Sequence, residues 1–137
     1  MDKRKVLVID DFPDMLKLIR YYLERKGCQV FTAASLEEGW QIFEREKPQA
    51  CSLDLCTFGG VENAFIFVQR VRLADRNVVR LAMTRVPLDS NEEQLNHLGL
   101  HGVFLKKDWG ENHEKFLAML AGEIKLDDPD KTDRNKT

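Results

Sequence analysis

The sequence contains no apolar run of membrane-spanning length, and the apolar residues near its amino terminus are too few for a signal peptide. We therefore expect a cytoplasmic protein with no membrane partner. Basic residues are not in excess either, because the formal net charge is -2 at pH 7. A protein that binds nucleic acid usually gathers lysine and arginine on one face. We therefore expect no nucleic-acid partner.

Cysteine is scarce, and its few copies form no metal-binding or disulfide pattern. Cys28, Cys51 and Cys56 are odd in number and lack Cys-x-x-Cys spacing, so we interpret them as reduced thiols. The histidines also lack the spacing of zinc ligands relative to the cysteines or the acids. A glycine-rich phosphate loop that ends in lysine and serine or threonine is missing too, which argues against a nucleotide hydrolase.

The chain does contain a regular alternation of apolar runs and segments with helical spacing. Its 137 residues, of which 43% are hydrophobic, suit one compact domain. Proline at position 13 and a capping box of Ser35 and Glu38 predict the starts of two helices, and Asp89 or Ser90 caps a later one. The five expected strands are Lys5–Ile9, Cys28–Ala33, Gln49–Leu53, Val78–Met83 and Gly102–Leu105.

This alternation predicts an α/β fold. We expect a doubly wound, five-stranded parallel sheet of the flavodoxin-like kind, with the common strand order 2-1-3-4-5 and helices on both faces. The domain is expected to span residues 4–124. Residues 125–137 are polar, lack an apolar stripe and are expected to form a disordered tail.

Polar side chains stand where several of these strands end. In chain order they are Asp10 and Asp11, Asp54, Thr84, and the lysines at 106 and 107. The carboxyl ends of parallel strands meet at one crevice, where ligands of such sheets bind. A single carboxylate inside an apolar run, such as Asp54, is costly to bury unless a metal or a cation meets it. We therefore expect these side chains to form one site.

The chemistry of these groups is complementary. Three carboxylates supply the oxygen ligands that Mg²⁺ prefers. If Asp54 is a nucleophile, its carboxylate oxygen attacks phosphorus to form an acyl phosphate, while Mg²⁺ and a lysine neutralise the charge. The Thr84 hydroxyl can donate a hydrogen bond to a phosphoryl oxygen, which makes a contact that exists only when phosphate is present.

Four stretches resemble the receiver domain of two-component response regulators. They are residues 6–11, Asp54-Leu55, Thr84 and residues 104–107. The resemblance implies that Asp54 is the phosphoacceptor, that Asp11 binds Mg²⁺ directly and that Asp10 assists, often through water. It also implies that the main-chain carbonyl of Cys56 is a metal ligand.

The same resemblance assigns roles on the last strand. It implies that Phe104 is the aromatic residue whose rotamer follows the movement of Thr84. Lys106 and Lys107 both suit the role of the site lysine. We assign the role to Lys107, because Phe104 and Lys107 have the aromatic-x-x-lysine spacing of the family, and we interpret Lys106 as a solvated neighbour.

The sequence departs from the family pattern in three places. Thr57, Phe58 and Glu62 stand where the family usually has methionine, proline and glycine. Arg85 follows Thr84 where a small residue is usual, and Asp108 follows the lysine pair where proline is usual. The loop after Asp54 and the mouth of the crevice should therefore differ from those of other members.

We expect a bacterial, single-domain receiver, a phosphoprotein that accepts a phosphoryl group on Asp54 from a histidine kinase or a histidine phosphotransfer protein. It would signal to a downstream effector protein, and a phosphorylation-dependent dimer is compatible with this function. We do not expect an enzyme in the usual sense, although the chain would assist its own phosphotransfer and dephosphorylation. The alternative is a pseudo-receiver that binds partners without phosphorylation. A Mg²⁺-dependent phosphatase or phosphotransferase is disfavoured, because Cys56 stands where such enzymes usually have a second acid.

Overall fold

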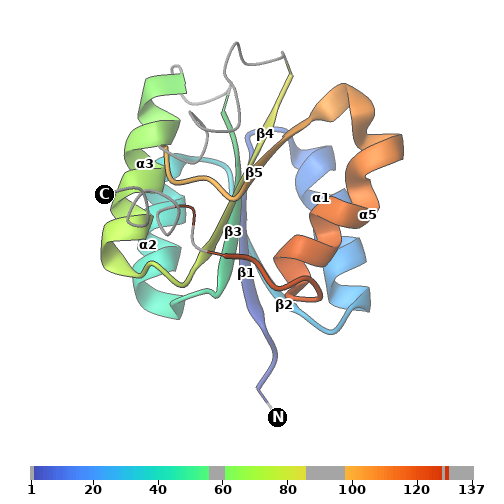
Figure 1. The fold of residues 1–137 in the computed structure, drawn as a ribbon, viewed down its shortest axis with the longest axis horizontal. Helices are drawn as coiled ribbons and strands as arrows, with labels where there is room; N and C mark the ends of the chain where they lie inside the picture. Colours follow the sequence, from blue (N-terminus) through green and yellow to red (C-terminus); the bar gives the residue numbers. More distant parts are fainter. Residues whose placement is uncertain (1, 56–60, 86–97, 128, 130–137) are drawn as a thin grey trace.

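The structure is a computed structural model that describes residues 2–55, 61–85, 98–127 and 129. Its centre is a five-stranded parallel sheet with the strand order β2-β1-β3-β4-β5 (Figure 1). This confirms the predicted fold class and strand order. The strands are β1 (Lys5–Ile9), β2 (Gln29–Ala33), β3 (Ala50–Asp54), β4 (Val79–Thr84) and β5 (Gly102–Leu105).

Helices cover both faces of the sheet, with α1 and α5 on one face and α2 and α3 on the other (Figure 1). The loop at 56–60 and the segment at 86–97, which includes the start of the predicted fourth helix, lie outside the described residues. The described helices are α1 (Pro13–Arg25), α2 (Leu36–Glu46), α3 (Val61–Ala74), the short 3-10 helix η1 (Lys106–Asp108) and α5 (Trp109–Ala121).

Local sequence signals explain where these helices begin and how closely they pack. Ser35 Oγ accepts a hydrogen bond of 3.1 Å from the main-chain N of Glu38, whose own carboxylate accepts one of 3.3 Å from Ala34 N. Gly39 allows α2 to lie close to β1. A Cβ atom at this position would lie 2.5 Å from Cδ1 of Ile9, so any larger residue would force the Ile9 side chain or the helix to shift.

Each face of the sheet has its own apolar core. The α1–α5 core contains Ile19 and Phe116 and receives Phe104 from β5. The α2–α3 core contains Phe67 and receives Val103 from β5. These adjacent residues pack on opposite faces because successive side chains of a strand alternate. Among the described residues, no helix combines the length and apolar character needed to cross a membrane.

Two cysteines and one residue of the carboxyl-terminal segment pack in or against the apolar cores. Cys28 and Cys51 are buried free thiols, and burial raises the pKa of Cys51 to about 12. Both are therefore poor nucleophiles, whereas Cys56 lies outside the described residues. Of the predicted tail, the structure describes residues 125–127 and 129, and Leu126 packs against the α1–α5 core.

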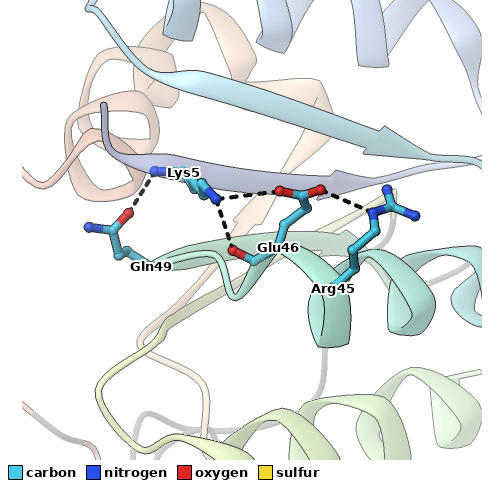
Figure 2. Close-up of polar contacts among 4 residues, drawn as sticks. All are labelled: Lys5, Arg45, Glu46 and Gln49. Carbon is cyan, nitrogen blue, oxygen red and sulfur yellow. Dashed lines mark hydrogen bonds and ion pairs between the residues drawn. The ribbon is translucent and has the colours of Figure 1, made fainter. Parts of the chain in front are cut away.

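A solvent-facing chain of charged side chains lies at the amino-terminal edge of the sheet (Figure 2). Lys5 Nζ lies 3.4 Å from one carboxylate oxygen of Glu46, and the other oxygen lies 3.0 Å from Arg45 Nε. Gln49 Oε1 accepts a hydrogen bond of 2.7 Å from the main-chain N of Lys5. These contacts connect the start of β1 to the end of α2 and to the chain just before β3.

Candidate functional site

Three carboxylates meet at the carboxyl edge of the sheet, as the sequence predicted. Oxygen atoms of Asp10, Asp11 and Asp54 all lie within 4.8 Å of one another. Asp54 ends β3, while Asp10 and Asp11 follow β1, and these two strands pair directly. The side chains of Asp10 and Asp54 are buried, whereas that of Asp11 is exposed. The cluster therefore has two fixed members and one that faces solvent.

Asp10 is held on both sides by main-chain hydrogen bonds. Its Oδ1 accepts a bond of 2.9 Å from the N of Phe12, which precedes α1. Its own main-chain N donates a bond of 3.1 Å to the carbonyl of Ala33, the last residue of β2. Burial raises the pKa of Asp10, although hydrogen bonds from Lys106 and Phe12 act in the opposite direction.

A lysine ammonium group joins the two buried carboxylates. Lys106 Nζ lies 2.7 Å from Oδ2 of Asp54 and 2.9 Å from Oδ2 of Asp10. The Lys106 side chain is only 12% exposed, so burial by itself would lower its pKa. The hydrogen bonds to Asp54 and Asp10 outweigh burial, and the pKa of Lys106 is raised. Lys106 is therefore a charged ammonium group at neutral pH and is largely, though not fully, buried.

This geometry corrects the choice between the two lysines. We predicted that Lys107 reaches the carboxylates and that Lys106 is solvated, but Lys106 makes both contacts and Lys107 is exposed. The reason is that β5 ends at Leu105 and the chain enters the 3-10 helix η1 at Lys106. Side chains three apart are eclipsed in that helix, so the alternation of a strand cannot be extended to Lys107.

The two predicted switch residues lie on opposite faces of the sheet. Thr84 ends β4 and is fully buried, and it pairs in register with Leu105. Phe104 pairs with Met83 and packs in the α1–α5 core, with its ring centroid 5.3 Å from that of Phe116. Met83 and Thr84 are consecutive, so their side chains point to opposite faces.

Phe104 is thus badly placed to follow a movement of Thr84, and this corrects the sequence-based assignment. The β5 residues on the same face as Thr84 are Leu105, its partner in register, and Val103, which packs against the α2–α3 core. Val103 lies three positions before Lys106. The interval of three residues between the strand residue and the site lysine is therefore present one residue earlier than we placed it, with valine in place of the aromatic residue. Sequence reasoning missed Val103 because it searched for an aromatic residue.

The remaining predicted features of the site are described only in part. Arg85, immediately after Thr84, is exposed at the carboxyl edge. Asp108 ends η1 and directly precedes α5. Cys56, whose carbonyl we predicted to bind metal, and the atypical residues Thr57 and Phe58 lie outside the described residues.

A family model for the response regulator receiver domain matches residues 6–118, which is most of the chain. The chain belongs to this family. The match includes both strand-end aspartates of the first strand, Asp54, Thr84 and Lys106.

Curated relatives match this receiver domain over shorter stretches. The chain is 42% identical over 52 residues to the alkaline phosphatase synthesis transcriptional regulatory protein PhoP of Bacillus subtilis. That match covers 38% of this chain and 22% of PhoP. An uncharacterised 14.6 kDa protein of Leptolyngbya boryana is 38% identical over 50 residues, which cover 36% of this chain and 38% of that protein. The chain thus matches only about a fifth to two fifths of these relatives.

Solved structures share the fold of this receiver domain at low sequence identity. The chemotaxis protein CheY4 of Vibrio cholerae superposes with a TM-score of 0.73 at 22% identity, over 87% of this chain and 99% of that chain. A two-component response regulator of Clostridium difficile also gives 0.73, at 19% identity, over 90% and 100% of the two chains. These likenesses support the fold assignment.

Proposed function

We propose that this receiver domain accepts a phosphoryl group on Asp54 and signals through the resulting change at the carboxyl edge of the sheet. The observation that carries the proposal is the contact of Lys106 with both Asp54 and Asp10 in a buried site. Buried charges are costly, so a cluster of two carboxylates and an ammonium group at a strand end is typical of a functional site. Family membership gives the reaction class.

The proposed step is a displacement at phosphorus. A carboxylate oxygen of Asp54 forms the new P–O bond, while the bond from phosphorus to the donor breaks and the donor leaves with its electron pair. Lys106 contacts one carboxylate oxygen of Asp54 and is placed to neutralise charge on the transferred group. Thr84, buried at the end of the neighbouring strand, would donate its hydroxyl to a phosphoryl oxygen.

The acidic cluster fits a divalent cation. Its three carboxylates supply closely spaced, hard oxygen ligands from adjacent strand ends, which suits Mg²⁺. We assign Asp11 and Asp54 as direct ligands and Asp10 as a ligand through water, with the Cys56 carbonyl still a prediction. Mg²⁺ bound there would stabilise negative charge on the transferred group.

The partners follow from this chemistry. The donor would be a phosphohistidine of a histidine kinase or of a histidine phosphotransfer protein, and the acceptor of the signal would be a downstream effector. The chain would not turn over a separate substrate, so we propose a phosphoacceptor that assists its own phosphorylation and dephosphorylation. A cytoplasmic location also remains a prediction.

Intact-mass measurement after incubation with acetyl phosphate and Mg²⁺ tests the proposal. We expect the wild-type chain to gain the mass of one phosphoryl group, and hydroxylamine to remove it, because an acyl phosphate is sensitive to this nucleophile. Asp54→Asn should gain nothing, since an amide cannot form the acyl phosphate. The matched control is Asp75→Asn, an exposed aspartate just after α3 that should behave as wild type.

Phosphorylation of the Asp54→Asn variant to the wild-type extent would place the acceptor elsewhere and refute the assignment. A wild-type chain that gains no mass from acetyl phosphate or from a phosphohistidine donor would favour the pseudo-receiver.

A further inference from the structure

Helix α3 exposes two large apolar side chains on its outer side, where Glu62, Asn63 and Arg70 are exposed as well. Its inner residues, including Phe67 and Val71, are buried in the α2–α3 core. On the outside, Ile66 is 59% exposed and Leu73 is 83% exposed. Large apolar side chains that share one exposed face of a helix are candidates for contact with a partner. Among the described helices, α1 instead exposes mostly charged residues such as Arg20 and Glu24.

The surface around Ile66 is hollowed where α3 meets α2. Ile66, Phe67 and Arg70 of α3 line a groove of about 620 Å³ whose other wall is formed by α2, including Trp40. The Arg70 guanidinium lies over the Trp40 ring, 3.9 Å from its centroid. This cation–π contact draws the Arg70 charge toward α2 and away from the line that joins Ile66 and Leu73.

The charges along α3 are arranged in a self-complementary way. Glu62 lies in the first turn, Ile66 and Leu73 follow seven residues apart, and Arg76 comes just after the helix ends. Two such helices side by side in antiparallel directions would place Ile66 of one copy beside Leu73 of the other. The same register would place Glu62 of one copy near Arg76 of the other, and the symmetry would repeat both contacts.

We propose that the outer face of α3 is a dimer interface whose occupant is a second copy of this chain. A two-fold axis beside the middle of α3 makes each contact occur twice, as an isologous interface requires. Antiparallel helix dipoles and the paired acidic and basic ends favour this direction over the parallel one.

The interface expected from this helix is small. Residues 66 and 73 are about 10 Å apart along a helix, because each residue rises about 1.5 Å. Contacts that involve mainly one helix and the rim of one groove bury less area than a permanent dimer needs. The dimer should therefore be reversible and dependent on concentration.

Sedimentation equilibrium over a wide range of protein concentration tests this proposal. The wild-type chain should pass from monomer to dimer. Ile66→Glu and Leu73→Glu should each weaken self-association by at least about tenfold, because a carboxylate would then face an apolar side chain. Tyr21→Glu, an equally exposed site on α1, should leave it unchanged. A wild-type chain that stays monomeric, or an unchanged dimer in Ile66→Glu, would overturn the proposal.

A charge exchange tests the antiparallel register. Glu62→Arg and Arg76→Glu should each weaken the dimer, and the double variant should recover it, since the opposite charges would again face each other. Failure of the double variant to recover the dimer would overturn the register. The measurements need neither phosphodonor nor Mg²⁺, and Asp54→Asn should dimerise as wild type. The result is therefore independent of whether Asp54 is a phosphoacceptor.

Discussion

The two edges of the sheet use the same kinds of charged side chain in very different surroundings. At the carboxyl edge, Lys106 meets Asp54 and Asp10 at 2.7 and 2.9 Å, and the three side chains are at most 12% exposed. At the amino edge, Lys5 meets Glu46 at 3.4 Å, and Arg45 beside them is 63% exposed (Figure 2).

The difference in exposure between the two clusters determines how strongly each one affects the stability of the fold. Water competes for the charges at the amino edge and screens them, so each exposed pair contributes little to stability. At the carboxyl edge, little water remains to solvate a charge whose partner is removed. The buried cluster therefore ties folding to charge balance, and any added phosphoryl group or cation must disturb it. We therefore expect function at the carboxyl edge and tolerance of substitutions at the amino edge.

The largest effect should come from removing the buried ammonium group. Lys106→Met leaves Asp54 and Asp10 facing each other, and we expect a loss of about 3 kcal/mol in the free energy of unfolding at neutral pH. Phosphorylation by acetyl phosphate should slow by about 100-fold, because a charge that stabilises the transferred group is lost. Urea denaturation and time-resolved intact-mass measurements check these expectations.

Lys107→Met is the matched control, since it removes the same charge from the next residue. Its side chain is exposed, so stability should change by less than about 0.5 kcal/mol. If the two variants lose equal stability and equal phosphorylation rate, the distinction between the lysines fails.

The parts of the molecule that the sequence predicted are the parallel sheet and the acidic cluster at its carboxyl edge. The parallel sheet followed from alternating apolar runs and helical segments. Its strand order did not follow from this pattern and was expected only because 2-1-3-4-5 is common in doubly wound sheets. The meeting of Asp10, Asp11 and Asp54 followed from their common position at strand ends. Both steps use periodicity over long stretches, which tolerates an error of one residue.

The assignments on β5 did not tolerate such an error. An aromatic-x-x-lysine spacing fits residues 104 and 107, but the structure places Val103 on the face of Thr84 and Lys106 on the carboxylates. A shift of one residue in a strand exchanges its two faces. The end of the strand at Leu105 was predicted correctly, but the sequence has two adjacent lysines and gives no signal that a 3-10 helix begins at Lys106. Only the structure therefore shows which lysine reaches the carboxylates.

A divalent cation should stabilise the protein through the acidic cluster at the carboxyl edge and not through the charges at the amino edge. Mg²⁺ should raise the melting temperature, because it binds the folded acidic cluster and offsets repulsion among its carboxylates. At ten times the dissociation constant, the gain is about 1.4 kcal/mol, or about 4 °C for a domain of this size. Differential scanning fluorimetry with and without Mg²⁺ measures the shift.

Asp11→Ala should erase most of this Mg²⁺ response, since it removes the exposed member of the cluster while the buried pair stays. Glu46→Ala, a carboxylate removed from the amino edge, should keep the full response. A Mg²⁺ shift that survives in Asp11→Ala would exclude Asp11 as a ligand.

Asp10 should make a measurable contribution to the pH dependence of the free energy of unfolding. Burial, the largest influence, raises the pKa of Asp10 above its ordinary value of 3.8. Between 3.8 and the raised value the folded chain binds more protons than the unfolded chain, so Asp10 makes stability fall as the pH rises through this window. Asp10→Asn should remove this contribution while the amide oxygen can still accept the bond from Phe12. Urea denaturation at a series of pH values should show wild type losing stability relative to Asp10→Asn as the pH rises, and parallel curves would contradict the expectation.

The smallest effect should come from the amino edge. The hydrogen bond from Arg45, together with that from Lys5, lowers the pKa of Glu46 despite an opposing influence of burial. Glu46 therefore stabilises the fold above its ordinary pKa of 4.5, and this contribution is lost as the pH falls through the lowered value. Because the side chains of this cluster are 24 to 63% exposed, Glu46→Gln should change the melting temperature at neutral pH by less than about 2 °C, and added salt should reduce the change further. It should also leave phosphorylation by acetyl phosphate unchanged, because the site lies at the opposite edge of the sheet.

A loss of stability as large as that of Lys106→Met would show that exposure does not separate the two clusters, and the contrast between the edges would have to be abandoned.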